Sequence, residues 1–430
     1  MNDIPRKEAM EDVAVRSPAA PARTTHVRAD EPTGLKRLRI IVVLGALIAL
    51  GPLTIDMYLP ALPSIGADLG APDSAVQLTL TGTLLGLGLG QLLIGPVSDV
   101  IGRRKPLIAG TALHIAASLA CLIAPNVAVL GGLRVVQGVG AAAAMVVAMA
   151  VVRDLWSGRA SATALSRLIL VMGIAPILAP TLGGAVLLST SWRGVFGVLA
   201  ALGAALLVLA VLALPESLPP QRRQQPRFAP VLATYGKLLT DREFVLLLVV
   251  AALAMTALFS YVSGSSFVLQ EQYGLNQQAF GLVFGAGAVA LIGASQLNVV
   301  LLNRFTTMQI VVTSLIVATA SGLVMVALTT TGIGGLVGFL VPLWLVLGSM
   351  GFVMPNAPAL ALGRHGEAAG TAAALLGACQ FGLGALIAPL VGVLGNDGPA
   401  MAVIMTSGAA VALVALAAVV RLSNRTVAAA

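Results

Sequence analysis

The sequence has few charged residues. They make up only 10% of its 430 residues, whereas a soluble globular protein carries about a quarter. That is too few to cover a surface in contact with water. Apolar residues make up 58% of the chain, and the mean hydropathy is +0.98. The shortage of charge excludes an ordinary soluble protein and predicts a chain that is solvated by lipid.

Cysteine and histidine are scarce as well. Cys121 and Cys379 both lie inside apolar runs, which argues against a disulfide framework or a cysteine-based metal site. There are three histidines, and neither an H-E-x-x-H nor a G-x-S-x-G motif is present. The sequence also lacks the Gly-x4-Gly-Lys-Ser/Thr phosphate loop of ATPases. We therefore expect no enzymatic activity, no metal and no cofactor.

Long apolar runs are abundant instead. About 20 apolar residues suffice for a helix to cross the ~30 Å hydrocarbon layer of a membrane, and twelve such runs predict an all-α membrane protein with twelve transmembrane helices. In the second run, Gly82, Gly86 and Gly90 share one helical stripe, which predicts close packing of helix backbones. The expected limits are 38–61, 75–97, 106–124, 128–151, 164–189, 194–214, 243–267, 278–301, 307–329, 333–355, 368–394 and 399–421.

One long polar interruption, which begins PESLPPQRRQQPR, divides the runs into six plus six. Such an arrangement indicates an internal duplication and two pseudo-symmetric six-helix bundles. We expect the amino-terminal tail to be cytoplasmic and disordered. The expected segments are the tail 1–34, a first bundle 35–214, a linker 215–242, a second bundle 243–422 and a cytoplasmic tail 423–430.

The basic residues predict the orientation of the chain. Nearly all of the 25 lysines and arginines fall in the two tails, in the linker and in alternate loops; Arg134 and Arg193 are the exceptions. Because positively charged loops stay in the cytoplasm, both termini are expected on the cytoplasmic side of the cell membrane.

Asp56 and Arg134 are the charged residues that remain within the apolar runs. Counted at ~1.5 Å per residue, both lie in the outer third of the membrane, at similar depth. A charge there is costly unless it is paired or hydrated. We expect the two to form a pair that opens when the carboxylate takes up a proton. The alternative for Asp56 is a solvated helix end.

Further polar side chains lie within or at the ends of the runs. Gln137 follows Arg134 by one turn and would either line the same cavity or bond to a neighbouring helix. Tyr58, Asn356 and Gln380 are possible cavity residues too, with contacts between helices as the alternative.

The loop after the second run reads GPVSDVIGRRKPL and resembles the signature loop of the major facilitator superfamily. Ordinary cytoplasmic charge would explain the arginines but not the aspartate and the two glycines. Gly95 would permit close helix approach, and Asp99 could accept hydrogen bonds from arginines. The resemblance implies a latch that holds the outward-facing state closed on the cytoplasmic side. The residues that carry it are Gly95, Asp99, Gly102, Arg103 and Arg104.

Further segments are similar to the same superfamily. LRVVQGVGAA resembles its fourth-span motif, whose arginine, here Arg134, is linked to proton transfer. MGIAPILAPTLGG resembles the fifth-span motif of its drug/proton antiporters, although Ala179 replaces a glycine. TIDMYLPALP and FSYVSGSSFVLQEQYGLNQQAFGLVF resemble the bicyclomycin/chloramphenicol-resistance branch. The fifth-span positions are Gly173, Pro176, Pro180, Gly183 and Gly184.

The resemblance implies a proton-coupled exporter of small, largely apolar drugs, working as a monomer by alternating access. Its partners would be the drug, protons and membrane lipid, with no nucleic acid. An exporter of an endogenous metabolite (an amino acid, a sugar or a siderophore) is the alternative on the same scaffold. A membrane enzyme would need a cluster of acids or histidines at one depth, and a permease subunit would need an element that docks an ATPase; the sequence favours neither.

Overall fold

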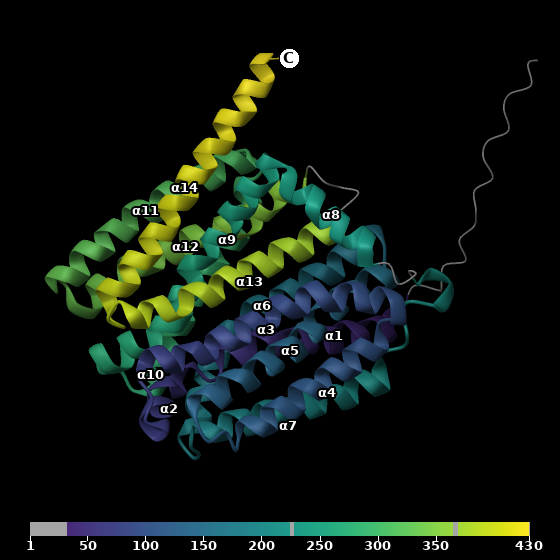
Figure 1. The fold of residues 1–430 in the computed structure, drawn as a ribbon, viewed down its shortest axis with the longest axis horizontal. Coiled ribbons are helices and arrows are strands. Elements are labelled where there is room, and N and C mark those ends of the chain that lie inside the picture. The colour runs from purple at the N-terminus through teal and green to yellow at the C-terminus, as the bar shows by residue number, and fades with distance from the viewer. Residues whose placement is uncertain (1–31, 224–227, 364–368, 430) are drawn as a thin grey trace, which may run out of the picture. The chain divides into compact units, whose positions relative to one another are not determined.

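The computed structural model describes residues 32–223, 228–363 and 369–429, and within them it contains helices and no strand (Figure 1). The expected tail 1–34 lies, up to residue 31, outside the described residues. The long helices of the first half are α1 (Gly34–Asp56), α3 (Asp73–Ile101), α4 (Arg104–Cys121), α5 (Val127–Leu155), α6 (Gly158–Leu187) and α7 (Trp192–Ala213). Those of the second half are α9 (Arg242–Phe267), α10 (Gln277–Leu301), α11 (Thr307–Thr331), α12 (Gly335–Leu362), α13 (Ala369–Val393) and α14 (Gly398–Ala429).

These helices confirm the all-helical membrane fold, and each expected run coincides with one of them. Within the described ranges, 11 helices have the length and apolar composition to cross a membrane. The remaining expected run, 106–124, corresponds to α4. This helix has 18 residues and begins with Arg104 and Lys105, which lowers its mean hydropathy. It packs against α5 and α7 within the first bundle.

Shorter elements were not expected from the sequence. After Asp56 the chain continues through η1 (Leu59–Ala61) and α2 (Leu62–Leu69), and each begins with a proline in its first turn, where the missing N–H costs nothing. The linker contains η2 (Pro220–Arg222) and α8 (Phe228–Thr240), and α9 ends in a widened turn, η3 (Val268–Gln272). The expected linker 215–242 is therefore partly helical.

Small residues determine how closely α3 and α5 pack. A Cβ on Gly86 would collide with the carbonyl oxygen of Val135, and one on Gly138 would collide with that of Thr83. Gly82 and Gly90 face α5 with equally little room. The close backbone approach predicted from the glycine stripe is confirmed. Between the two bundles, α13 packs along α3 and α10 packs along α6 (Figure 1).

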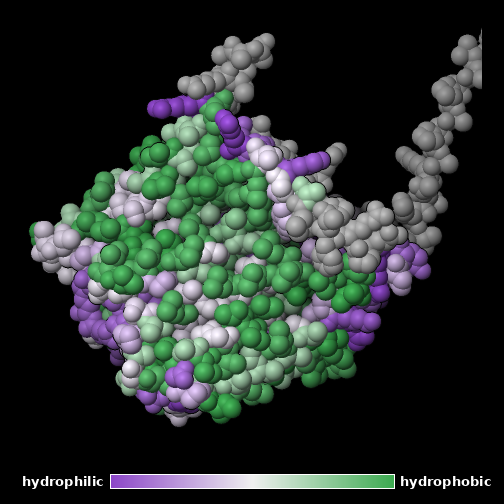
Figure 2. Space-filling model, viewed as in Figure 1, coloured by the Kyte–Doolittle hydropathy of each residue, from purple (hydrophilic) through white to green (hydrophobic). Residues whose placement is uncertain are grey.

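Apolar side chains cover much of the face shown in Figure 2, and hydrophilic residues gather at its margins. Leu212, Leu282 and Val414 are each about two thirds exposed, which is the arrangement expected of helices that face lipid.

We call the end that carries the start of α1 and the α3–α4 and α5–α6 connections the basic end. The other end, where α1 runs into α2, is called the opposite end.

Candidate functional site

Arg134 is a fully buried side chain inside the first bundle. From α5 it donates through Nη1 to Oε1 of Gln137 at 2.6 Å and through Nη2 to the backbone carbonyl of Thr54 at 2.9 Å. Its guanidinium carbon lies 4.0 Å from the centre of the Tyr58 ring and 5.5 Å from that of Phe196. Neutral oxygens and aromatic faces, both of which stabilise a cation, thus hold this charge.

The contacts of Arg134 continue into a ring of hydrogen bonds that joins α1, α4 and α5. Gln137 donates to the hydroxyl of Ser118, which in turn donates to the backbone carbonyl of His114, both at 2.7 Å. His114 Nε2 lies 2.9 Å from Oγ1 of Thr54, and this closes the ring. All of these side chains are fully buried, so the ring fixes α1 at the depth of Arg134.

The partners of Thr54 determine the tautomer of His114. The Thr54 hydroxyl donates its one proton to the carbonyl of Leu50 at 2.6 Å. His114 must therefore donate through its Nε2–H. Nδ1 is buried and has no partner among the residues that the structure describes. Toward Thr54 the imidazole therefore acts as a hydrogen-bond donor.

Asp56 is the last residue of α1 and is 4% exposed. In the described part of the chain it makes neither a hydrogen bond nor an ion pair, and Arg134 bonds to Thr54 instead. It interacts electrostatically with Tyr58 and with Tyr261 of α9. Asp56 thus lies near both bundles as a buried carboxyl group, and no bond joins it to Arg134 in this conformation.

The structure places the other possible cavity residues in two regions. Tyr58 packs on Arg134 and lies 3.3 Å from Oγ1 of Thr79 through its hydroxyl. In the second bundle, Asn356 donates to Oδ1 of Asn298 at 2.7 Å, and Gln380 donates to the carbonyl of Ala251 at 3.4 Å. Gln137 thus belongs to the ring of hydrogen bonds around Arg134, and Tyr58 packs beside it, whereas Asn356 and Gln380 join helices of the second bundle. We call the ring, which consists of Thr54, His114, Ser118, Arg134 and Gln137, the Arg134 ring.

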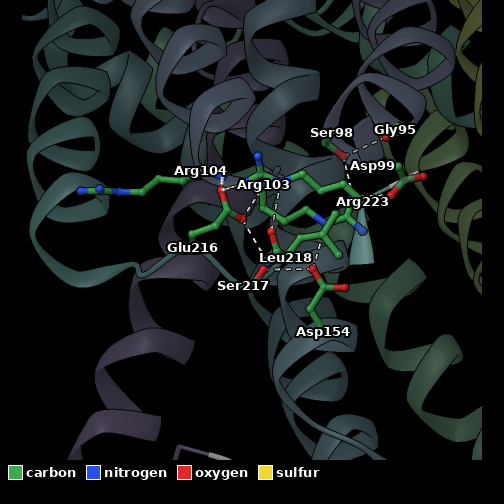
Figure 3. A network of polar contacts seen from close by, with 10 residues as sticks. All are labelled: Gly95, Ser98, Asp99, Arg103, Arg104, Asp154, Glu216, Ser217, Leu218 and Arg223. Atoms are coloured by element: carbon green, nitrogen blue, oxygen red, sulfur yellow. Dashed lines mark hydrogen bonds and ion pairs between the residues drawn. The ribbon is translucent and has the colours of Figure 1, made fainter. Parts of the chain in front are cut away.

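The signature loop forms a network of polar contacts at the basic end (Figure 3). Arg103 pairs with Asp99 at 2.5 Å and with Asp154 of α5 at 2.8 Å, and it also donates to the hydroxyl of Ser98 at 2.6 Å. Its side chain is therefore held against both α3 and α5. Burial would lower the pKa of Arg103, but the bonds to these carboxylates raise it above its ordinary value.

Glu216, at the start of the linker, holds the backbone of this loop. Its carboxylate accepts from the backbone N–H groups of Arg103 at 2.8 Å, Leu218 at 3.0 Å and Arg104 at 3.3 Å. Partial burial acts to raise the pKa of Glu216, but these bonds and the nearby charge of Arg223 together hold it below its ordinary value. The ionised carboxylate of Glu216 thereby holds the linker to the signature loop.

The two glycines of the signature loop differ in what they permit. Gly102 has a φ of +94°, and a Cβ there would lie 2.5 Å from Oε2 of Glu216. It is required both for its backbone conformation and for the approach of the carboxylate. A Cβ on Gly95 would meet only Val146, at an ordinary 4.0 Å, so the close helix approach expected at Gly95 is absent here.

The fifth-span residues lie on α6, where Pro176 and Pro180 are inside the helix. A Cβ on Gly183 would collide with the carbonyl oxygen of Met57, directly after Asp56. One on Gly184 would lie 3.0 Å from the carbonyl of Gln277 in the second bundle, whereas Gly173 has ordinary contacts with Ile292. Gly183 thus allows α6 to support the end of α1, and Gly184 allows it to approach α10.

Hydrogen bonds between the bundles gather toward the opposite end. Gln77 of α3 donates to Oδ1 of Asn396 at 2.7 Å and to the carbonyl of Ser263 at 3.3 Å, and it accepts from the N–H of Gly392 at 2.9 Å. Asn396 donates in turn to Asp73 at 2.8 Å. Nearby, Ser266 and Gln270 donate to the carbonyls of Leu59 and Pro60. We call Asp73, Gln77, Gly392 and Asn396 the amide clasp; it fastens the bundles together at this end.

Several residues of these sites were missed by reasoning from the sequence. Thr54, Ser118 and His114 are common polar residues on three different helices, and only the packing of those helices brings them to Arg134. Asp154 and Glu216 carried a weak signal, because both are acids in otherwise basic connections. Gln77 and Asn396 are more than 300 residues apart in the chain, and no local pattern links them.

Comparison with known proteins identifies relatives of similar length. The sequence profile of the Major Facilitator Superfamily matches residues 44–389. The "Uncharacterized MFS-type transporter YdgK" of Bacillus subtilis (strain 168) is 38% identical over 384 residues, which are 87% of this chain and 93% of the relative. The "Bicyclomycin resistance protein homolog" of Haemophilus influenzae is 31% identical, over 88% and 94% of the two chains. The "Multidrug resistance protein MdtL" of Escherichia coli O45:K1 is 31% identical, over 80% and 85%.

Solved structures share the fold at low sequence identity. A bacterial homologue of the human lysosomal transporter Spinster, in an inward-facing and occupied conformation, aligns with a TM-score of 0.70 and 16% identity, over 92% of this chain and 98% of that one. The xylose transporter XylE from E. coli, in a partially occluded inward open conformation, aligns with a TM-score of 0.69 and 14% identity, over 89% and 97% of the two chains.

Proposed function

Because the chain belongs to the major facilitator superfamily, we propose that it exports small, largely apolar antibiotics of the chloramphenicol and bicyclomycin type in exchange for protons. The observation that carries the proposal is Asp56, a buried carboxyl group beside the Arg134 ring and close to Tyr261 of the second bundle. The names of the resistance relatives support the substrate class. Apolar walls with few polar groups fit broad selectivity.

The orientation follows from the basic end. Arg103, Arg104 and Lys105 lie there, and positive charge is retained in the cytoplasm. We place the basic end and both termini inside the cell and the opposite end outside. In this orientation the amide clasp closes the outward side of the transporter. The structure then corresponds to the stage of the cycle before the drug is released outside.

In the transport cycle, Asp56 takes a proton from the outside when the opposite end opens and the drug leaves. It releases the proton to the cytoplasm once the clasp has re-formed, and the site then regains its affinity for drug. The hydrogen bonds that Arg134 makes to Thr54 and Gln137 are those expected while Asp56 is protonated. An ionised Asp56 would compete for the guanidinium, and α1 would move with it.

The driving force is the inward movement of the proton. One charge crossing the membrane potential releases ~2.3 kcal/mol per 100 mV, or about one order of magnitude of drug gradient per 60 mV. No ATP hydrolysis or cofactor enters this scheme, and a single chain suffices for it. The protein's partners are accordingly the drug, protons and the surrounding lipid of the cell membrane.

The test is efflux from cells that express the wild type, Asp56→Asn or Arg134→Ala, with and without a protonophore. Chloramphenicol and a lipophilic cationic dye are the substrates. Asp68→Asn and Arg193→Gln are matched controls, because this second Asp–Arg pair lies on the surface, where its carboxylate is 48% exposed. We expect wild-type efflux to collapse with the protonophore, both site variants to fail at normal membrane levels, and both controls to transport.

Efflux that survives the protonophore, or normal transport by Asp56→Asn, would contradict the proton coupling. A wild type that leaves both drugs inside the cell, yet releases an amino acid, a sugar or a siderophore in a protonophore-sensitive way, would replace the drug by an endogenous metabolite and leave the coupling in place.

A further inference from the structure

A hollow of about 560 Å³ lies at the basic end between the first turns of α1 and α6. Three arginines line it, Arg37 from α1 and Arg159 and Arg167 from α6, together with Leu38 and Thr163. The lining residues of α1 and those of α6 are more than 120 residues apart in the chain, so the hollow exists only because the two helices start side by side. Neither the Arg134 ring nor the signature loop includes any of these residues.

The hollow carries positive charge, and among the described residues that line it there is no acid. In the described part of the chain none of the three arginines has an ion pair. Arg37 donates to the carbonyl of Ala160 at 3.3 Å, and its guanidinium carbon lies 6.0 Å from the centre of the Trp156 ring. These contacts hold one guanidinium in place and leave most of its N–H groups unused.

Apolar side chains extend from the hollow along α1. Leu38 is 51% exposed, and Val42, one turn further toward the membrane interior, is 60% exposed. On α6, Leu170 follows Arg167 and is 49% exposed. A cluster of cationic side chains therefore lies at the end of a row of exposed apolar side chains. This arrangement is complementary to a phospholipid, which has an anionic headgroup followed by hydrocarbon chains.

We propose that this hollow binds the phosphate group of an anionic membrane phospholipid. Guanidinium groups bind phosphate oxygens through paired, charge-assisted hydrogen bonds, and basic pockets between helices bind anionic headgroups. The acyl chains would lie along Leu38 and Val42. A free phosphate anion would satisfy the arginines equally, but it would leave these apolar side chains unused, so the lipid is the ligand that matches the whole surface.

The test measures lipid binding to the purified full-length chain by native mass spectrometry and does not depend on transport. The probes are short-chain phosphatidylglycerol, phosphatidylcholine of the same chain length, and inorganic phosphate. The variant is R37Q/R159Q/R167Q. The control, R222Q/R304Q/R421Q, removes the same number of exposed charges from places outside the hollow. Monodisperse elution on size exclusion establishes that each protein is folded.

We expect the wild type to bind phosphatidylglycerol in preference to phosphatidylcholine. The hollow variant should bind it about 100-fold more weakly, and the control should stay within about twofold of the wild type. If the triple variant does not fold, R37Q and R167Q alone should each weaken binding by about fivefold.

Three results would overturn the proposal. The first is a wild type that binds the two lipids equally, and the second is an equal loss of binding in the hollow variant and the control. The third is displacement of phosphatidylglycerol by an equal concentration of inorganic phosphate, which would make the hollow a site for the free anion instead of a lipid.

Discussion

Arg134 donates to the backbone carbonyl of Thr54 at 2.9 Å, two residues before Asp56 in the same helix. The fully buried guanidinium of Arg134 is thereby connected to the buried carboxyl group of Asp56 through the backbone of α1, without a direct bond. Any change in the charge of Asp56 acts on a segment that Arg134 already holds. Substitutions in the Arg134 ring should therefore change both stability and transport.

His114 should be required as a hydrogen-bond donor. Replacing it with leucine removes the Nε2–H that holds Thr54, and we expect a loss of ~1–3 kcal/mol in stability together with slower transport. His114→Gln restores an amide N–H in this position and should recover most of both. Thermal unfolding and initial efflux rates measure the two effects. A leucine variant that matches the glutamine variant in both would show that the bond to Thr54 is dispensable.

Gly102→Ala should destabilise the signature loop. The residue has a φ of +94°, and a methyl group would meet the carboxylate of Glu216, so we expect a loss of ~1 kcal/mol or more. Gly132→Ala is the matched control, because a Cβ on that helical glycine would have no other atom within 4 Å. Thermal unfolding in detergent compares the two. Equal midpoints would contradict the requirement for glycine at Gly102.

The contribution of Glu216 should depend on pH in a defined direction. Its pKa is lower in the folded protein than the ordinary 4.5, so the folded state binds its proton less tightly than the unfolded state does. The stabilisation is therefore complete above pH 4.5 and is lost as the pH falls through the folded-state pKa. Wild type and Glu216→Gln should differ in unfolding temperature at pH 7, and the difference should shrink as the pH falls below 4.5. A difference that persists undiminished at that acidity would argue against the ionised carboxylate as its source.

Gln77→Ala should open the bundles at the opposite end. The substitution removes bonds to Asn396, Ser263 and Gly392, each worth ~0.5–1.5 kcal/mol, so the open population should rise about tenfold or more. Spin labels at Ser189 and Thr330, both exposed, would report a longer distance. Gln309→Ala is the control, since it removes only the capping box of α11 at the basic end. An unchanged distance distribution in Gln77→Ala would show that the amide clasp does not hold this end closed.

The fold could be predicted from the sequence because each apolar run must form its own backbone hydrogen bonds in lipid. The run at 307–329, for example, became α11 with almost the same bounds. The glycine stripe of α3 could also be predicted, because the spacing of residues along one helix is visible in the sequence itself. The helix α8 could not be predicted in this way, because it follows a polar stretch in the same linker and is too short to cross a membrane.

The sites could be predicted only in part. Arg134 and Asp99 stood out because a charge inside a membrane or an acid in a basic loop is rare. Their partners did not, since Thr54, His114 and Glu216 gain significance only from contacts across 50 or more residues. The expected pairing of Asp56 with Arg134 assumed that equal depth brings side chains together, whereas the direction in which each leaves its helix also matters.

The amide clasp and the signature loop use different chemistry, and this has a consequence for how the two ends respond to dissolved salt. The clasp joins amides, backbone groups and a single carboxylate, and contacts between neutral dipoles are hardly screened by ions. The loop relies on pairs of full charges that are partly open to water, which mobile ions weaken. With the proposed orientation, the contacts that close the outward side would be insensitive to the salinity of the cell's surroundings, and the salt-sensitive ionic pairs would lie in the compartment whose salt content the cell regulates.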